Sequence, residues 1–324
     1  MHPPVLENVK HPLTGSPMKR SLPSYVLITP ARNEAAYIEL TLQSMIAQTV
    51  LPLKWVIVSD GSTDGTDDIV NKYTASHPWI ELVRMPERTA RNFAGKVYSF
   101  NAGYDRVKDL PYDVIANLDA DVSFDPDYFD FLLGKLDGNP KLGVAGTPFR
   151  EGDFQYDYRI VSLEHVSGQI QVFRRACFEA IGGYRPLKTG GVDLTAVITA
   201  RMKGWETRTF LEKPYQHHRK MSSVNHSPLA GAFNGGRVDY LLGCDPIWQF
   251  FRSVYRMVKY RPIIVNGALC LAGFVWAMVT RQEKSIPADV VQFRRGEERR
   301  RLGDLIKKAL TGRATSPQTN ARRS

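Results

Sequence analysis

Residues 25–34 read YVLITPARNE, and residues 54–66 read KWVIVSDGSTDGT. In each stretch a short apolar run, 25–28 or 55–58, leads directly into a polar loop. Such runs, partly β-branched and soon interrupted, are typical of strands that are buried on both faces of a sheet. The residues between the two runs carry apolar side chains at offsets of four, seven and eight, which predicts a helix over 35–49. Its apolar positions are Ile38, Leu42, Met45 and Ile46.

The same alternation continues along the chain. Residues 66–68, Thr-Asp-Asp, are a favourable helix start, because a hydroxyl caps the helix and carboxylates interact with the positive end of its dipole. Further strands are expected at 80–83 and 114–118, with a helix around 97–107 between them. Alternating strands and helices predict βαβ units, and therefore an α/β fold with a mainly parallel sheet flanked by helices.

Polar clusters stand where the predicted strands end. They are Arg32-Asn33-Glu34, Asp60-Gly61-Ser62 and Asp119-Ala120-Asp121. In open parallel sheets, ligands bind outside the carboxyl ends of the strands, where the loops emerge. The sequence therefore predicts a binding site formed by these three clusters.

Composition excludes several classes of protein. The chain has 324 residues, of which 43% are hydrophobic and 23% charged, a balance typical of a globular protein and not of a disordered or multi-span membrane chain. Its cysteines form no CxxC pair, which predicts small reduced core residues and neither disulfides nor a zinc site. They are Cys177, Cys244 and Cys270. Residues 1–22 lack the apolar segment of a signal peptide, so secretion is not predicted.

The net charge of +10 is concentrated at one end of the chain. Residues 1–244 hold 27 Lys and Arg against 27 Asp and Glu, whereas residues 245–324 hold 16 against 6. A basic segment on a neutral body predicts an anionic partner for that segment. Nucleic acid is the weaker candidate for this partner, because apolar and aromatic residues precede the basic stretch.

The pair Asp119 and Asp121 directly follows a predicted strand. Two carboxylates this close repel each other unless a cation lies beside them, and hard oxygen ligands suit Mg²⁺ or Mn²⁺. A solvated turn explains the same residues equally well at this point. The loop 60–66 is similarly open: Asp60 could accept hydrogen bonds from a base or ribose, or the loop could be a turn that ends in a helix cap.

Taken together, these stretches resemble family 2 glycosyltransferases with the GT-A fold. The matching segments, which fall within residues 24–220, are Thr29–Glu34, Val56–Thr66, Gly95-Lys96 with Asn101–Gly103, Asp119–Asp121 as the DxD motif, Gly182–Tyr184 and Gly204-Trp205. Their order along the chain is the order in that family. The resemblance implies a metal-dependent, inverting transfer of a sugar from a nucleotide diphosphate, with Mg²⁺ or Mn²⁺ as the cofactor.

The resemblance also implies roles for individual residues. Those implied to bind the nucleotide are Pro30, Arg32, Glu34, Asp60, Lys96 and Asp119; Asp119 and Asp121 would hold the metal and diphosphate. Asp193 stands eleven residues before Gly204, the place of the catalytic base in this family. Val192 replaces the Glu that usually precedes that base, and Thr195 replaces a frequent second acid. A carboxylate at the start of a helix over 194–202 is the alternative reading of Asp193.

Residues 216–219 read QHHR and are followed by Lys220, where processive polysaccharide synthases have a Trp. We interpret them as a cluster close to the donor, in which His218 could ligate metal and Arg219 could bind the diphosphate. Surface histidines beside basic residues are the alternative.

The C-terminal part contains 19 residues without charge, 262–280, preceded by a mixture of aromatic and basic residues at 248–259. That length is marginal for a membrane span. A full span would place Arg294 and Arg295 outside the cell, against the usual distribution of positive charge. We therefore expect a surface-lying or re-entrant anchor on the cytoplasmic face of the cell membrane. A buried helical hairpin packed on the catalytic domain is the alternative.

The expected organisation is a mobile lead-in at 1–22, a GT-A catalytic domain at 23–244, a helical, basic, membrane-associating region at 245–312 and a disordered tail at 313–324. The expected function is transfer from a nucleotide-sugar donor, a UDP-sugar, to a hydroxyl of a lipid-linked or glycan acceptor in cell-envelope or exopolysaccharide synthesis. Val192 favours one rival, a non-catalytic nucleotide-sugar-binding scaffold. A nucleotidyltransferase is disfavoured, because no basic glycine-rich loop follows the first strand.

Overall fold

The structure is a computed structural model that describes residues 22–87, 94–152, 158, 161–219, 228–259 and 262–311. The lead-in expected at 1–22, Leu22 excepted, and the tail expected at 313–324 lie outside this described part. The strands expected at 25–28, 55–58, 80–83 and 114–118 are all found. The helix expected over 97–107 lies three residues earlier, at Ala94–Tyr104. The helix expected over 35–49 is shorter, at Ile38–Ile46.

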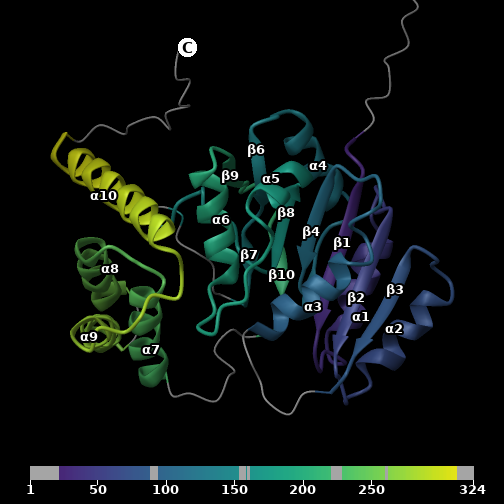
Figure 1. Cartoon of the computed structure of the whole chain (residues 1–324), viewed down its shortest axis with the longest axis horizontal. Helices are drawn as coiled ribbons and strands as arrows, with labels where there is room; N and C mark the ends of the chain where they lie inside the picture. The colour runs from purple at the N-terminus through teal and green to yellow at the C-terminus, as the bar shows by residue number, and fades with distance from the viewer. Residues whose placement is uncertain are drawn as a thin grey trace, which may run out of the picture.

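A seven-stranded sheet forms the centre of the molecule (Figure 1). Its spatial order is β3 (Ile80–Met85), β2 (Lys54–Asp60), β1 (Tyr25–Ala31), β4 (Val114–Leu118), β8 (Ile170–Arg174), β6 (Leu142–Gly146) and β9 (Glu206–Thr209). The pairs among β3, β2, β1 and β4 are parallel, as is β6 with β9, whereas β8 runs antiparallel to both its neighbours. This confirms the predicted α/β fold with a mainly parallel sheet.

Helices cover both faces of the sheet. One face packs against α1 (Ile38–Ile46), α2 (Thr66–Thr74) and α4 (Tyr128–Asp137). The other packs against α3 (Ala94–Tyr104), α5 (Arg175–Ala180) and α6 (Val192–Met202). Since the side chains of β1 alternate between these two cores, the strand is buried on both faces, as its continuous apolar run predicts.

A second, three-stranded sheet lies beside the carboxyl ends of the main strands. Its order is β5 (Val122–Ser123), β10 (Tyr215–His217) and β7 (Phe149–Arg150). β5 immediately follows Asp121, and β10 pairs with it antiparallel, so that His217 lies opposite Val122. The small sheet therefore brings residues 215–219 next to the acidic pair, although some 95 residues separate them in sequence.

In the described part of the chain, four helices follow the sheets: α7 (Pro228–Leu241), α8 (Pro246–Lys259), α9 (Val265–Val279) and α10 (Ala288–Thr311). We call them the helical unit; Figure 1 shows them side by side at one end of the molecule. The domain boundary expected at residue 245 falls between α7 and α8. Helix α7, which precedes this boundary, packs against α9, which follows it. Glycines permit that packing, because a Cβ at Gly236 or Gly273 would overlap a backbone carbonyl of the facing helix.

The uncharged stretch 262–280 forms α9 and the turn before it. One side of α9 is buried against its neighbours through Cys270, Phe274 and Ala277, whereas Val275 and Val279 are exposed. Among the described residues, no helix combines the length and hydropathy that crossing a membrane requires.

The helical unit packs on the part of the chain that carries the two sheets, through α6. Leu242, between α7 and α8, contacts Gly191 at the start of α6, and it shares a small core with Ile198, Val290 and Val291. At the other end of α6, Arg201 makes a bidentate ion pair with Glu297 of α10. The helix that bears Asp193 is therefore held between the sheet and the helical unit.

Candidate active site

The loops that follow β1 and β2 are joined by hydrogen bonds. The Asn33 backbone N–H donates to Ser62 Oγ over 3.1 Å, and the Thr63 N–H donates to Asn33 Oδ1 over 2.9 Å. Asn33 holds a left-handed backbone with a φ of 54°, a conformation that Asn tolerates better than most residues. The Glu34 N–H donates to Thr66 Oγ1, which ties this loop to the start of α2 as well.

This linked pair of loops carries the residues expected to bind the nucleoside. Asp60, the last residue of β2, is buried, and its Oδ2 lies 3.8 Å from a guanidinium nitrogen of Arg32. Pro30 lies near the end of the adjacent strand β1. Arg32, Asp60 and Pro30, three of the residues expected to bind the nucleotide, thus lie together at the carboxyl ends of β1 and β2.

Lys96 forms an ion pair with Asp119, just beyond the carboxyl end of β4. Its Nζ lies 2.5 Å from Asp119 Oδ1 and 3.3 Å from the Gly168 carbonyl oxygen. Asn117 donates from Nδ2 to the same carbonyl over 2.9 Å. Desolvation alone would lower the pKa of Lys96, but the negative charges of Asp119, Asp193 and Asp121 raise it, so this side chain is a stable cation.

Asp193 lies in the first turn of α6, beside Gly168. A Cβ at Gly168 would lie 2.6 Å from Asp193 Oδ2, so only glycine leaves room for this carboxylate. The Asp193 carbonyl accepts a long hydrogen bond (3.4 Å) from Nε2 of the buried Gln171, whose Oε1 accepts from the Tyr184 hydroxyl. The sheet thereby fixes the backbone that carries Asp193.

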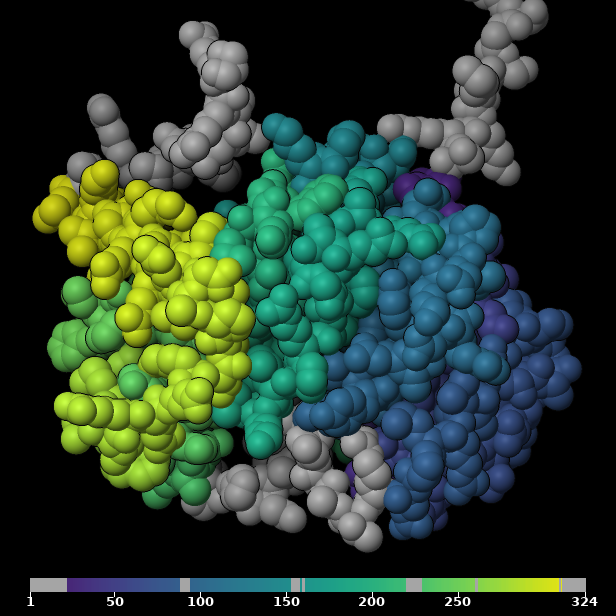
Figure 2. Space-filling view, in the orientation of Figure 1, coloured from purple at the N-terminus to yellow at the C-terminus, as the bar shows by residue number. Residues whose placement is uncertain are grey.

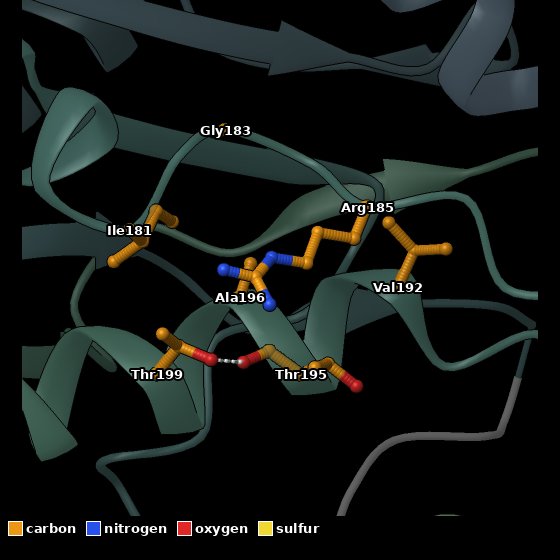
Figure 3. Close-up of a pocket in the computed structure, with 7 residues that line it drawn as sticks. All are labelled: Ile181, Gly183, Arg185, Val192, Thr195, Ala196 and Thr199. Carbon is orange, nitrogen blue, oxygen red and sulfur yellow. Dashed lines mark hydrogen bonds between the residues drawn. The ribbon is translucent and has the colours of Figure 1, made fainter. Parts of the chain in front are cut away.

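Val192 and Thr195, which stand where the family pattern has acidic residues, lie close to each other. Both line a shallow pocket beside α6, drawn in Figure 3. The Thr195 and Thr199 hydroxyls donate to carbonyls one turn earlier, at Gly191 and Thr195. Val192 also packs against the apolar cores on both sides of α6, so its side chain serves packing. The other residues of the pocket are Ile181, Gly183, Arg185 and Ala196.

The second acid, Asp121, faces residues of the small sheet. Its Oδ2 lies 3.5 Å from His217 Nε2 and 3.6 Å from Arg219 Nε. Arg219 also forms an ion pair with Glu34, and His217 Nδ1 lies 2.8 Å from Glu151 Oε2. Desolvation would lower the pKa of His217, but the two flanking carboxylates raise it. Burial and Asp121 raise the pKa of Glu34 to about 8, against the lowering effect of Arg219.

His217 was not among the residues singled out from the sequence. The structure directs its ring at Asp121, whereas the ring of His218 contacts Ser123 Oγ at 2.8 Å and stacks on Tyr37. His218 approaches Asp121 through its backbone N–H, which donates to the Asp121 carbonyl. Alternation along β10 is the signal that would have distinguished them, because His217 shares its buried side with Tyr215.

The residues around Asp121 fit a divalent cation in part. Among the residues that the structure describes, no three His, Cys, Asp or Glu side chains form a preformed metal cage. Mg²⁺ commonly binds through one or two carboxylates together with substrate phosphates, and does not need such a cage. Asp121, with His217 beside it and Asp119 two residues earlier, supplies donors of that kind at the carboxyl end of β4.

Residues 26–193, just over half of the chain, match glycosyl transferase family 2. The chain belongs to this family. Chondroitin synthase of Pasteurella multocida is 30% identical over 139 residues, which is 43% of this chain and 13% of the relative. Poly-beta-1,6-N-acetyl-D-glucosamine synthase of Staphylococcus aureus is 27% identical over 212 residues, 61% of this chain and 46% of the relative. This glycosyltransferase thus spans less than half the length of these relatives.

Solved structures share the fold. A mannosyltransferase of Pyrobaculum calidifontis, in complex with GDP-mannose and Mn²⁺, matches with a TM-score of 0.55 at 19% identity, covering 94% of this chain and 92% of that one. TarS of S. aureus (residues 1–349), in complex with UDP-GlcNAc, matches with a TM-score of 0.51 at 14% identity, covering 79% and 73%. Both likenesses concern the architecture and agree with the predicted GT-A fold.

Proposed function

We propose that this family 2 glycosyltransferase inverts the anomeric carbon as it moves a sugar from a UDP-sugar to an acceptor hydroxyl. The observation that carries the proposal is that Lys96 pairs with Asp119 at the carboxyl end of β4 and contacts the carbonyl of Gly168, the residue against which the Asp193 carboxylate packs. Donor-binding loops lie on one side of this cluster and α6 lies on the other. This arrangement of acids and a cation supports a site at which a diphosphate and an acceptor would meet.

In the proposed reaction, Asp60 and Arg32 bind the nucleoside at the end of β2, and Lys96 and Arg219 supply positive charge near the diphosphate. The acceptor oxygen forms a bond to the anomeric carbon as the bond from that carbon to the diphosphate oxygen breaks. Asp193 takes the proton of the acceptor hydroxyl, as a general base. A divalent cation, held by Asp121 with Asp119 or His217, would stabilise the negative charge of the diphosphate.

The acceptor that we propose is lipid-linked or part of a glycan, in cell-envelope or exopolysaccharide synthesis at the cytoplasmic face of the cell membrane. Two relatives support the polysaccharide context, because their names are those of synthases of glycan polymers. UDP-GlcNAc in one structural neighbour and GDP-mannose in another make these two nucleotide sugars the first donors to test.

The decisive experiment compares Asp193→Asn with Asp121→Asn and uses Asp125→Asn, an exposed acid just after β5, as the matched control. UDP titration with and without Mn²⁺ reports donor binding, and release of UDP from UDP-GlcNAc or of GDP from GDP-mannose reports turnover. Asp193→Asn should lose about 10²- to 10⁴-fold in turnover with UDP binding retained. Asp121→Asn should lose the metal-dependent part of UDP binding. Normal turnover by Asp193→Asn would remove it as the base.

A non-catalytic role in nucleotide-sugar binding is the second candidate, favoured by Val192, which serves packing where the family usually has an acid. It predicts UDP binding that depends on Asp121, without turnover of any donor by the unaltered chain. Turnover that needs both Asp121 and Asp193 excludes it.

A further inference from the structure

Helix α8 is inverted relative to an ordinary surface helix. Its polar residues Gln249 and Ser253 are fully buried, and Arg252 forms an ion pair with Asp239 of α7 beneath the helix. Its outward side is apolar instead: Phe250 is 51% exposed and Val258 is 77% exposed. Soluble proteins place such residues the other way round, so this arrangement needs something apolar to cover it.

The exposed apolar side continues past the end of α8. The backbone N–H of Ile264 donates to the Met257 carbonyl, which folds the turn before α9 onto the last turn of α8. Ile263 and Ile264 are both more than half exposed there. We call this surface the outer face; it consists of Phe250, Phe251, Val254, Val258, Ile263 and Ile264. Figure 2 shows the helical unit, green to yellow, as one flank of the molecule.

The stretch of sequence that carries the outer face contains charges of one sign only. From residue 246 to residue 282 the sequence contains no Asp or Glu, whereas it contains Arg and Lys at several positions. Lys259 is exposed at the end of α8, next to Val258, and Arg281 is exposed after α9. Apolar and aromatic side chains on a stretch that carries exposed cations and no acids of its own complement a surface that is apolar below and anionic at its boundary.

We propose that the outer face docks on a lipid bilayer that contains anionic phospholipids, with its apolar side chains inserted at the level of the headgroups. A second copy of the chain would gain less from this arrangement, because the excess of cations would be brought against itself. The docking does not depend on the chemistry at Asp193. Its consequence, that the acceptor hydroxyl is presented by a lipid-anchored molecule, rests on the proposed function.

The helical unit links the outer face to the acceptor side of the site. Leu242, four residues before α8, packs on Gly191, two residues before Asp193. A bilayer under the outer face therefore lies on the side of the molecule that α6 faces, away from β2 and β3 at the opposite end of the sheet (Figure 1). A lipid-anchored acceptor would reach Asp193 from the membrane, and the nucleotide sugar would enter from solution.

Vesicle co-sedimentation of the full chain tests the proposal. The probe is a mixed vesicle of phosphatidylcholine and phosphatidylglycerol, with phosphatidylcholine alone for comparison. The variant is Phe250→Asp/Val254→Asp, and the matched control is Leu53→Asp, whose side chain is equally exposed (49%) on the catalytic body. The double variant should partition at least about tenfold more weakly, because two carboxylates would enter the headgroup region. Leu53→Asp should bind as the unaltered chain does.

The other readouts separate the alternatives. UDP binding by the double variant, unchanged from the unaltered chain, shows that its fold is intact. Equal binding of both variants to vesicles, or equal binding to neutral and anionic vesicles, overturns the proposal. So does sedimentation velocity that shows a dimer which the double variant dissociates, because the outer face then belongs to a second copy. If UDP fails to bind the unaltered chain, the proposed function fails while the vesicle result stands.

Discussion

The helical unit contacts the start of α6, which carries Asp193, where Leu242 packs on Gly191. A substitution at Gly191 measures how much this contact matters. The Gly191 backbone is left-handed, with a φ of 77°, and a Cβ there would lie 2.4 Å from Leu242 Cδ1. Gly191→Ala therefore has two costs. The left-handed conformation costs about 1–2 kcal/mol for a residue with a Cβ, and forcing a methyl group against the buried Leu242 costs roughly 1–3 kcal/mol. We predict that the free energy of unfolding falls by about 2–5 kcal/mol.

Gly204, after the other end of α6, is the matched control. Its φ is 87°, and a Cβ there would meet nothing within 4 Å. Gly204→Ala should therefore cost only the conformational part, about 1–2 kcal/mol. The difference between the two variants isolates the contact with Leu242. Urea unfolding followed by circular dichroism gives both values, provided that each transition is cooperative with an unchanged slope.

The same variant should affect catalysis. Because Asp193 lies two residues after Gly191, a shift at the start of α6 moves the carboxylate, and a displacement near 1 Å can cost about 10²-fold in rate. Turnover should fall while UDP binding, on the other side of Lys96, stays unchanged. Equal costs for Gly191→Ala and Gly204→Ala, or full turnover by the former, would refute the proposed support. Adding Leu242→Ala to Gly191→Ala should recover part of the overpacking cost.

Three further predictions concern the helical unit and the cores. Glu297→Gln, which removes the charge paired with Arg201, should lower the free energy of unfolding by about 1–2 kcal/mol in urea titrations at neutral pH. Asp245 accepts from the Ile247 and Trp248 N–H groups and from Arg299; burial would raise its pKa, but these bonds lower it. The Asp245 carboxylate contributes its full stabilisation above the pKa of the unfolded state, about 4, and this stabilisation is lost as the pH falls through the lower pKa of the folded state. Asp245→Asn should therefore lower the free energy of unfolding by about 1–2 kcal/mol at pH 7 and by less in acid. Burial raises the pKa of the Cys177 thiol to about 12, so Ellman's reagent should react with no cysteine of the native protein at pH 8 and with all of them in urea.

The sequence predicted the parts of the fold that depend on local patterns. Apolar runs placed β1 and β2, and their polar loops placed Glu34 and Asp60 at one edge of the sheet. The antiparallel insertion of β8 between β4 and β6 could not be predicted, because strand order is decided by long-range pairing and packing. For the same reason, nothing local indicated that Gly168 would lie between Lys96 and Asp193.

Two details of the site show where sequence patterns were insufficient. A strand of three residues, β10, is too short for alternation to be noticed, and so His218 was singled out instead of His217. In α8 the pattern indicated a mixture of apolar and basic residues, but not which side would face the protein. That direction follows from the burial of Gln249 and Ser253, which depends on the helices packed beneath them.

The position of β9 and β10 limits how this enzyme can be dissected or grafted. The stretch that matches the family ends at residue 193, yet β9 pairs with β6 and β10 pairs with β5 beyond that point. A chimera joined at residue 193 would leave the edge of β6 open to unintended partners and would separate Asp121 from His217. Exchange of donor specificity with a relative should therefore use a junction after Arg219, so that the transplanted module carries its own closing strand.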